Sequence, residues 1–590
     1  STQPEGARIH LEFGEILQNS NFYNDNYRTA KGGFTYVSNG KPELVKPSFT
    51  FFGFRYVKVS GWQGEINPDD FTGCVTYSDL ERTGFLTTGN AKINQLYSNS
   101  LWSLKSNFLD IPTDCPQRDE RLGWTGDAQV FSATASYHMD TRAFYQKYLW
   151  DIQNEQSKLK GGVPAYAPKP PHGPISVVAA IWGDAATIIP DVLLKMFNEE
   201  TYKKNFPMMK AWVDYVGEEI EKVHQTKAAL WDFGFQFGDW LALDGPDLQA
   251  YKGDTPDDYL ATVYYWHSLE LVAGFAKRLR LESTQIYYSE LAEKVKEVLL
   301  SNFFTPVGHL SVPNQAAYIA ALNFGLWRDK DVLLQDFINL LQKHGNQIKC
   351  GFVGAPLICQ TLAKFGKIHE AYKLILREDF PSWLYAVNLG ATTIWERWNS
   401  VLPDGLISGT DMNSLNHYSY GSVVEFLYAY ASGLMPSSDQ GFAKALIAPH
   451  PHRELKSCNC KYVSNAGAYV VDWSIQDDGS LKVHIEIPFG CLATVNLPAS
   501  SLEPFELKSG SYDYHYVPNV DFRQKFTKAS TLDEIFEDEA ASRLALSLLP
   551  QLSFMKGNGG VTIDGLRRMT MFGITNESVD ALLDGLKEIG

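Results

Sequence analysis

Cysteine is scarce in this chain of 590 residues, and long apolar runs are missing. The seven cysteines are odd in number and scattered, and Cys458 and Cys460 lack the two-residue gap of common zinc or redox pairs. We therefore expect no disulfide framework and a reducing or redox-indifferent compartment. No apolar run approaches the ~20 residues that cross a bilayer, and none resembles a signal segment. The sequence predicts a soluble protein, cytoplasmic or periplasmic.

Positive charge is also in short supply. The chain has 52 Lys and Arg against 68 Asp and Glu, a net charge of −16, and no basic block. Nucleic acid and membrane surfaces are therefore poor candidate partners, and a neutral ligand fits better. No His, Asp or Glu spacing indicates a metal site, so we expect no metal and no cofactor. The sequence leaves a homo-oligomer open.

Aromatic residues are abundant, with 14 Trp, 30 Tyr and 34 Phe. Sugar rings present apolar faces that stack on flat side chains, so this surplus suits a carbohydrate enzyme. Most of the aromatics must nevertheless fill cores. The length and the 44% hydrophobic content predict a globular chain of two to four domains.

Hydrophobic periodicity changes several times along the chain. Residues 1–80 alternate as strands do, for example over Arg8–Phe13 and Phe54–Val59. Residues 81–436 follow helical spacing, with stretches near 128–152, 178–198, 205–224, 257–280, 285–303, 330–343, 357–377 and 421–432. Residues 437–520 alternate again, with an Asp478-Gly479 hairpin signal. Residues 521–590 return to helical spacing and predict a helical appendage.

The segment from Asp114 to Asp127 (DCPQRDERLGWTGD) carries the most chemical information. It contains four carboxylates, two arginines and a tryptophan, punctuated by one proline and two glycines. Carboxylates are rarely buried without compensation, whereas pockets combine flat apolar walls with a few placed polar groups. The segment therefore predicts a polar pocket rather than a solvated connector.

This segment resembles the signature of bacterial α-L-rhamnosidases, glycoside hydrolase family 78. The resemblance continues, in the family's order, at Trp182-Gly183-Asp184, Gly238-Asp239-Trp240, Ala391–Glu396 and Asn416-His417-Tyr418. It implies a multidomain, mainly α fold. In that fold an (α/α)6 barrel over 81–436 is flanked by an incomplete jelly-roll-like β-sandwich segment over 1–80 and by a C-terminal β-sandwich over 437–520.

The resemblance also implies an inverting glycosidase that releases terminal α-L-rhamnose. Glycoside cleavage needs a protonated carboxyl to donate to the leaving oxygen and a carboxylate on the opposite face. By resemblance, Glu120 is the general acid and Glu396 is the general base that activates water. Inversion predicts carboxyl groups roughly 6.5–9.5 Å apart.

The identity of the acid has one alternative. Some relatives have one residue fewer between the first aspartate and the glutamate, so counting from Asp114 selects Asp119, whereas counting back from Trp124 selects Glu120. The Gly-Trp-Thr-Gly-Asp block matches without gaps, so we prefer Glu120.

Other residues are candidate sugar ligands. Asp114, Asp127 and His417 would bind hydroxyls, and Arg118 would clamp a hydroxyl or pair with an aspartate. The remaining candidates form walls or add polar contacts; they are Asp119, Trp124, Trp182, Asp184, Trp231, Asp239 and Trp240. Two competing readings stay open: a glycosidase of this barrel class with another sugar specificity, and a non-catalytic sugar-binding relative.

Overall fold

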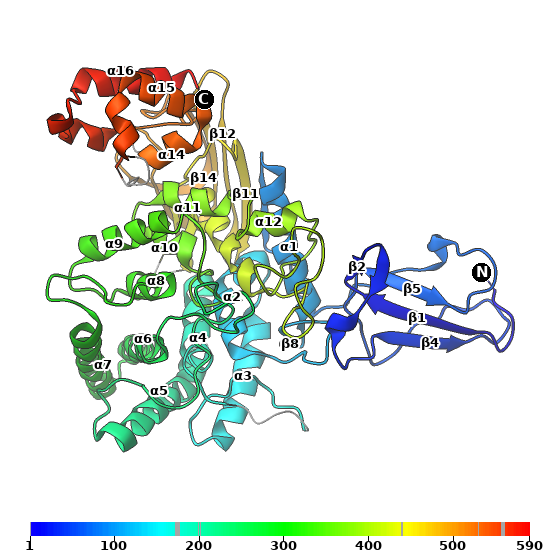
Figure 1. Cartoon of the computed structure of the whole chain (residues 1–590). Coiled ribbons are helices and arrows are strands. Elements are labelled where there is room, and N and C mark those ends of the chain that lie inside the picture. Colours follow the sequence, from blue (N-terminus) through cyan, green and yellow to red (C-terminus); the bar gives the residue numbers. More distant parts are fainter. Residues whose placement is uncertain are drawn as a thin grey trace.

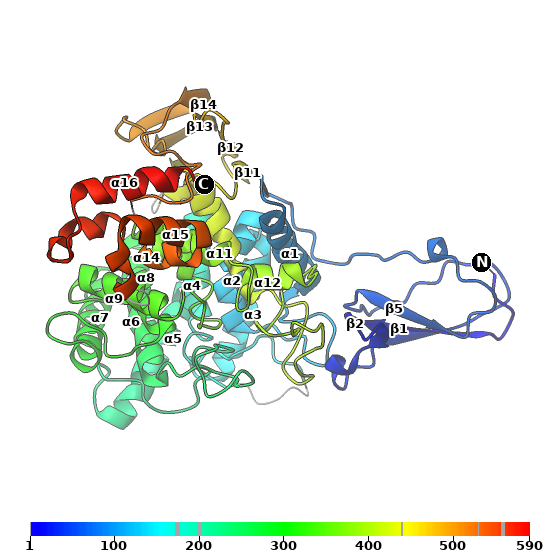
Figure 2. The same cartoon turned by 45° about the horizontal axis from the view of Figure 1, so that its top comes forward.

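The computed structural model describes residues 2–171, 177–198, 200, 202–437, 441–528, 530–555 and 561–589. The protein is mainly helical, with β-rich parts at both ends of the helical part and a small group of helices at the C-terminus (Figure 1). The N-terminal strands project to one side of the helices in both Figure 1 and Figure 2.

The N-terminal part forms a three-stranded antiparallel sheet and a separate hairpin. The sheet has the order β4 (Gly33–Val37), β1 (Arg8–Gly14), β5 (Tyr56–Ser60). The hairpin pairs β2 (Ile16–Gln18) with β3 (Asn21–Tyr23), and the short η1 turn (Asp25–Tyr27) follows it. The predicted strands are therefore present, and β1 alternates as its sequence does, burying Ile9 and Phe13.

The helical part begins at residue 91 and ends at 431. Its helices are α1 (Ala91–Asn107), α2 (Thr125–His138), α3 (Arg142–Lys158), α4 (Ala185–Phe197), α5 (Tyr202–His224), α6 (Asp257–Arg278), α7 (Glu282–Phe303), α8 (Gln315–Phe324), α9 (Lys330–Lys343), α10 (Ile358–Lys364), α11 (Ile368–Ile375), α12 (Trp383–Asn388) and the consecutive turns η3 (Ser419–Val423), α13 (Val424–Phe426) and η4 (Leu427–Ala431). The short strands β7 (Phe108–Leu109) and β8 (Ile111–Pro112) precede the acidic motif.

Two of the predicted helical stretches are broken. The stretch 128–152 divides into α2 and α3, because Met139 adopts an extended conformation and pairs with Arg82. The stretch 357–377 divides into α10 and α11 at Gly366, which has a φ of +73°. Hydrophobic periodicity continued across both breaks, so it could not reveal them.

The helices contact one another in alternation. Successive contacts run from α2 to α4, α6, α8 and α10, and then through η3 and α13 back to α2. The intervening helices α3, α5, α7, α9 and α11 each contact a member of that circuit. The loops that enter these inner helices therefore meet around one centre.

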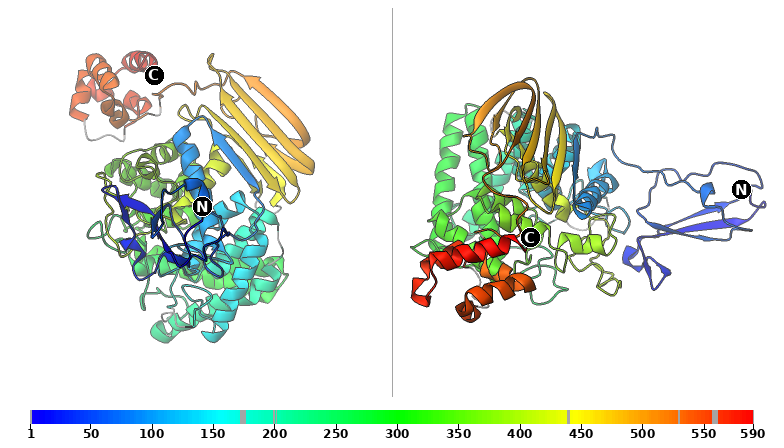
Figure 3. Two further views of the ribbon diagram at one scale, coloured as in Figure 1. Left: turned by 90° about the vertical axis from the view of Figure 1, so that its right-hand side faces the viewer. Right: turned by 90° about the horizontal axis from the view of Figure 1, so that it is seen from above.

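The C-terminal β-rich part is one seven-stranded sheet. It comprises β6 (Gly84–Thr88), β9 (Leu434–Ser437), β10 (Gly441–Ile447), β11 (Ser457–Ser464), β12 (Gly467–Ile475), β13 (Leu481–Val495) and β14 (Phe505–Tyr516). The predicted Asp478-Gly479 hairpin joins β12 and β13. Strand β6, which precedes the helices, pairs with β11 and appears as a blue strand beside the yellow ones in Figure 3.

The appendage has its own small core. Helices α14 (Leu532–Glu537), α15 (Glu539–Leu548) and α16 (Asn576–Lys587) pack around buried Leu and Ile side chains. Glu534 accepts from His369 at 2.7 Å and also pairs with Lys373, both on α11. Among the described residues, no helix is both long and apolar enough to cross a bilayer.

Gly84 on β6 offers a test of this packing. A Cβ atom there would lie 2.2 Å from the Tyr137 carbonyl oxygen, which belongs to the backbone and cannot rotate away. We expect Gly84→Ala to lower the free energy of unfolding by about 1–3 kcal/mol, measured by urea denaturation. The matched control is Gly274→Ala on the exposed face of α6, where nothing lies within 4 Å. That change should raise stability by about 0.5–1 kcal/mol, and equal effects of the two changes would contradict the packing described.

Candidate active site

The acidic motif forms a closed loop between β8 and α2. The backbone amide of Asp114 donates to the Leu122 carbonyl at 3.0 Å, and the Leu122 amide donates to Asp114 Oδ1 at 2.8 Å. The loop ends at Trp124, directly before the first turn of α2. Because the loop is fixed to itself, the side chains between these points have defined directions.

Arg118 lies at the centre of the site with only 1% of its side chain exposed. Its Nη1 donates to Glu396 Oε2 at 2.7 Å. Its Nη2 lies 3.0 Å from Glu396 Oε1, 2.9 Å from Glu120 Oε2 and 3.3 Å from Asp114 Oδ2. One guanidinium therefore gathers three carboxyl groups, including two glutamates far apart in the sequence.

The facing oxygens of the two glutamates are close together. Both lie around Arg118 Nη2, so Glu120 Oε2 and Glu396 Oε1 are at most about 5.9 Å apart, because the distances of 2.9 and 3.0 Å add to that value. The two oxygens are this close because both contact Arg118 Nη2. The 6.5–9.5 Å expected for an inverting pair separates whole carboxyl groups, so this limit on two facing oxygens does not test it.

Glu396 is held as a carboxylate. It lies in the loop between α12 and η3, is 2% exposed, and its Oε2 also accepts from the Ser414 amide at 2.7 Å. Burial alone would raise the pKa of Glu396, but Arg118 and the Ser414 amide outweigh burial and lower the pKa to about 2. Glu396 is therefore ionised at neutral pH, which is the form that can accept a proton.

Glu120 and Asp119 face different surroundings. Glu120 accepts from Trp124 Nε1 at 2.9 Å and touches Arg118, and 13% of its side chain is exposed. Asp119 accepts from the amide and the hydroxyl of Thr29 and from Arg28 Nε at 2.7 Å. Although partial burial raises the pKa of Asp119, Thr29 and Arg28 lower it below its usual value. Asp119 is thus held ionised outside the Arg118 cluster.

Asp114 and Asp127 are buried carboxyls beside the glutamates. Asp127, in the first turn of α2, accepts from the Ser419 hydroxyl at 2.9 Å and lies 3.2 Å from His417 Nε2. Burial raises the pKa of Asp127 to about 7, and burial together with Glu120 raises the pKa of Asp114. Burial lowers the pKa of His417 to about 4, so this ring is neutral at pH 7. Asp127 and His417 thus lie in contact, Asp114 contacts Arg118, and Asp127 interacts electrostatically with Glu120 and Glu396.

Two predicted sugar ligands accept hydrogen bonds from other parts of the protein. Asp184 is fully buried and accepts from the Trp212 indole, the Ser268 hydroxyl and the Ile181 amide. Asp239 is fully buried and accepts from the amides of Gly351, Val353 and Gly354. Protein donors therefore bind both carboxyls, and the roles of Asp184 and Asp239 as sugar ligands stay predictions.

The predicted tryptophan walls differ in position. The ring of Trp182 lies against Gly126, where a Cβ would come within 2.5 Å of it, and its buried Nε1 has no hydrogen-bond partner. Trp182 therefore borders the first turn of α2, next to Asp127. Trp231 is 5% exposed and packs against Trp212, so it belongs to the core. Trp240 is partly exposed and stacks on Tyr251 with ring centroids 5.6 Å apart.

The N-terminal part supplies site residues that the sequence did not reveal. Arg28 Nη2 lies 3.0 Å from Glu120 Oε2. Glu15 is buried and accepts from Gln117 at 3.1 Å and from the Leu415 amide at 3.2 Å, and burial raises its pKa to about 7. Neither residue stands in a motif, so only the folded chain could identify them.

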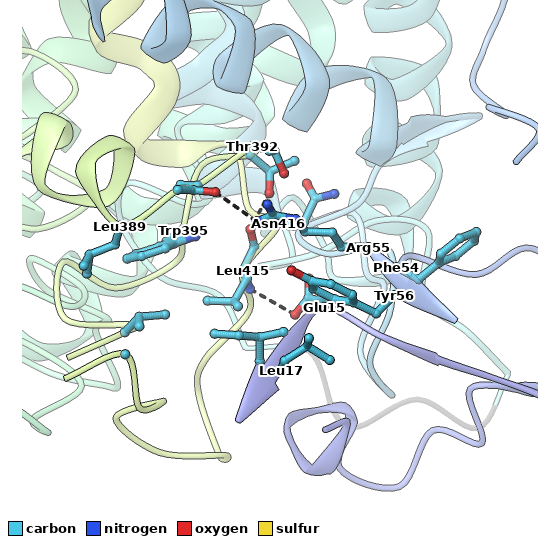
Figure 4. A pocket seen from close by; sticks show the side chains of 16 residues that line it. Glu15, Leu17, Phe54, Arg55, Tyr56, Leu389, Thr392, Trp395, Leu415 and Asn416 are labelled. Atoms are coloured by element: carbon cyan, nitrogen blue, oxygen red, sulfur yellow. Dashed lines mark hydrogen bonds between the residues drawn. The ribbon is translucent and has the colours of Figure 1, made fainter. Parts of the chain in front are cut away.

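A separate pocket opens where the N-terminal part meets the helical part. It has a volume of about 310 Å³ and is lined by residues 15–17, 54–56 and 389–393, among others (Figure 4). Trp395 lines this pocket, whereas its neighbour Glu396 contacts Arg118. The pocket therefore adjoins the carboxyl cluster at Glu15 but does not include the two glutamates that contact Arg118. No group of three or more His, Cys, Asp or Glu residues in the described part of the chain could hold a metal ion.

Three family models match consecutive parts of the chain. The chain matches the bacterial alpha-L-rhamnosidase concanavalin-like domain over residues 1–77, the 6 hairpin glycosidase domain over 81–431 and the C-terminal domain over 433–510. An alpha-L-rhamnosidase from Formosa agariphila is 34% identical over 86% of this chain and 54% of the relative. One from Streptomyces avermitilis is 31% identical over 86% of this chain and 48% of the relative.

Solved structures are similar as well. The α-L-rhamnosidase of Aspergillus terreus has a TM-score of 0.82 and 31% identity, over 87% of this chain and 60% of that one. The Streptomyces avermitilis enzyme, solved in complex with L-rhamnose, has a TM-score of 0.81 and 31% identity, over 87% of this chain and 50% of that one. This chain spans about half the length of the curated relatives it matches. It belongs to the bacterial α-L-rhamnosidase family, glycoside hydrolase family 78.

Proposed function

We propose that this protein hydrolyses terminal α-L-rhamnosides with inversion, using Glu120 as general acid and Glu396 as general base. The observation that carries the proposal is the contact of Arg118 with both glutamates. Glu120 donates a proton to the glycosidic oxygen as the bond from that oxygen to the anomeric carbon breaks. Glu396 takes a proton from the water that attacks the same carbon from the opposite face. The products are rhamnose and the alcohol of the leaving group.

The cluster can retain a proton at neutral pH. Three carboxyls, those of Asp114, Glu120 and Glu396, contact the buried guanidinium of Arg118. The Asp127 carboxyl interacts electrostatically with both glutamates, and the neighbouring His417 is neutral. Several buried like charges disfavour full ionisation, so at least one carboxyl keeps its proton. The raised pKa values of Asp114 and Asp127 supply this reservoir beside the acid.

Two observations support the separate roles of the glutamates. Both oxygens of Glu396 accept charge-assisted or backbone hydrogen bonds, which suits a fixed base better than a nucleophile that must move to form a bond. Glu120 is the most exposed of the four clustered carboxyls, so it borders the opening through which a leaving group departs. Glu120 contacts Arg118 at the centre of the cluster, whereas no hydrogen bond or ion pair joins Asp119 to Arg118, and this position favours Glu120 as the acid.

The sugar specificity follows from the walls and the charges. Trp124 and Trp182 flank the first turn of α2 and offer apolar surface to the methyl end of a 6-deoxy sugar. A uronide would need a cation of its own, yet the guanidiniums of Arg118 and Arg28 are both paired with protein carboxylates. A glycosidase with another specificity is the second candidate, and a non-catalytic sugar-binding relative is the third.

We also infer the finer architecture. The closed circuit of inner helices, each backed by an outer helix, supports an (α/α)6 barrel over 81–436. The β-rich parts over 1–80 and 437–520 are proposed as a jelly-roll-like β-sandwich segment and a β-sandwich domain, and 521–590 as a separate helical appendage.

Hydrolysis of 4-nitrophenyl α-L-rhamnoside, followed by proton NMR, tests the reaction. We expect turnover, with the β anomer of rhamnose formed first, because water attacks the face opposite the leaving group. A matched control is 4-nitrophenyl β-D-glucuronide, which should not be cleaved. First release of the α anomer would reject inversion, and absence of turnover on the rhamnoside would reject the activity.

Amide variants test the two roles. Glu120→Gln and Glu396→Gln keep the shape of each side chain but remove the proton donor and the proton acceptor. Each should lower kcat/KM for methyl α-L-rhamnoside, whose leaving group must be protonated, by about 10²–10⁴-fold, with the circular dichroism spectrum unchanged. Asp119→Asn is the matched control, and its kcat/KM should fall much less than that of the two glutamate variants. If Asp119→Asn is instead the crippling change, the assignment of the acid to Glu120 is wrong.

Asp127→Asn tests the proton reservoir through stability. The pKa of Asp127 is raised from 3.8 to about 7, so its contribution to stability is complete below pH 3.8 and is lost as the pH rises through 7. Asparagine does not titrate. Between pH 4 and 7 the wild type should therefore lose stability relative to Asp127→Asn, by up to about 1.4 kcal/mol per pH unit. Urea denaturation across this range measures the difference, and a constant difference would show that Asp127 stays ionised.

A further inference from the structure

Arg28 belongs to the N-terminal part, yet its guanidinium is bound entirely to the helical part. Nε lies 2.7 Å from Asp119 Oδ1, Nη2 lies 3.0 Å from Glu120 Oε2, and Nη1 donates to the Asp411 carbonyl at 3.2 Å. A fork used at three separate acceptors fixes the relative positions of those acceptors. Arg28 therefore connects Glu120 and Asp119, in the acidic motif, to the loop that contains Asp411.

The backbone at Arg28 is strained. Its φ of +58° and ψ of −115° lie outside the regions that residues with a Cβ normally occupy. Such a conformation persists only where the surroundings hold it, and it occurs preferentially at functional sites. Here the flanking residues are both anchored, since the Tyr27 ring is buried and Thr29 donates twice to Asp119. These anchors hold the strained backbone in place, and in this conformation the Arg28 guanidinium contacts Glu120.

The two arginines contact the same oxygen of Glu120, Oε2, but differ in their exposure to solvent. Arg118 is 1% exposed and contacts the buried carboxyls, whereas the side chain of Arg28 is 22% exposed. A terminal sugar bound among the buried carboxyls would leave its glycosidic oxygen beside Glu120 and its leaving group on the side of Arg28. The acid of any glycosidase lies next to the leaving group, so Arg28 is well placed to act on that half of the reaction.

An aromatic surface lies on the same side. Tyr251, which is 44% exposed, donates its hydroxyl to the Asp411 carboxylate, and Asp411 is the residue whose carbonyl accepts from Arg28. Trp240 stacks on the ring of Tyr251 with an interplanar angle of 14°. An exposed flat ring beside a charged fork suits the apolar face of a sugar or an aryl group.

We propose that Arg28 is a positioning residue for Glu120, and that the N-terminal part thereby forms the leaving-group side of the site. This inference rests on the proposed rhamnosidase function. Arg28 acts through the geometry of the acid and takes no proton itself. Its loss should therefore matter most where the leaving group cannot depart without a well-placed proton.

Two rhamnosides separate these effects. 4-Nitrophenolate is a good leaving group that needs little protonation, whereas the alkoxide from methyl α-L-rhamnoside must be protonated as it departs. We expect Arg28→Ala to lower kcat/KM for the methyl rhamnoside by about 10-fold more than for the 4-nitrophenyl rhamnoside, because small displacements of a catalytic group are costly. Arg28→Lys keeps the positive charge but loses the planar guanidinium. It should also lose more kcat/KM on the methyl rhamnoside than on the 4-nitrophenyl rhamnoside, by a smaller factor than Arg28→Ala.

Arg55→Ala is the matched control. Arg55 also crosses from the N-terminal part to the helical part, donating to the Gly390 carbonyl at 2.9 Å, but no hydrogen bond or ion pair joins it to a carboxylate of the cluster. This variant should leave the ratio of the two substrates unchanged. Equal losses on both substrates in Arg28→Ala would overturn the proposal and make Arg28 a docking residue. If Arg28→Ala does not fold, the ratio in Arg28→Lys decides in the same way.

The outcomes also distinguish the two levels of inference. Wild-type protein that cleaves neither rhamnoside would overturn the proposed function and this inference with it. Wild-type activity with an unchanged substrate ratio in both Arg28 variants would leave the function intact and overturn only the role of Arg28.

Discussion

The contact of Arg118 with Glu396 and Glu120 is the constraint on which the site depends. The two glutamates lie near the two ends of the sequence of the helical part. One guanidinium contacts both of them and so limits the distance between their facing oxygens. Arginine suits this position because its planar fork binds several oxygens at once and stays charged when buried. Removing one partner from such a cluster would leave buried charge uncompensated, so the cluster depends on each of its members.

Much of the site could be predicted from residue types and spacing. The acidic segment gave Asp114, Arg118, Glu120 and Asp127 because carboxylates at that density need compensation, and the structure supplies it in Arg118. Asp184 could not be judged in this way. A carboxylate beside a tryptophan looks the same whether its donors are protein groups or sugar hydroxyls, and only the folded chain shows the donors.

The fold could also be predicted in part, because the pattern of buried side chains can be read from the sequence. Alternation and helical spacing located the β-rich and helical parts, because these patterns follow from which side chains are buried. Strand β6 was missed, since its partner β11 lies far along the chain and no local pattern records that pairing. Arg28 was not predicted as a site residue for the same reason. Its acceptors belong to loops that meet the N-terminal part only after folding.

The carboxyl cluster is costly to maintain, and the surrounding architecture explains how the protein tolerates it. Buried charges are unfavourable unless they are paired and hydrogen-bonded, and here carboxyls outnumber the buried guanidinium. The closed circuit of inner helices buries an extensive apolar core around the site, and that burial offsets the local penalty. The confinement that raises the energy of the cluster also lets buried carboxyls keep a proton, so local instability and the proposed proton transfer have one physical origin.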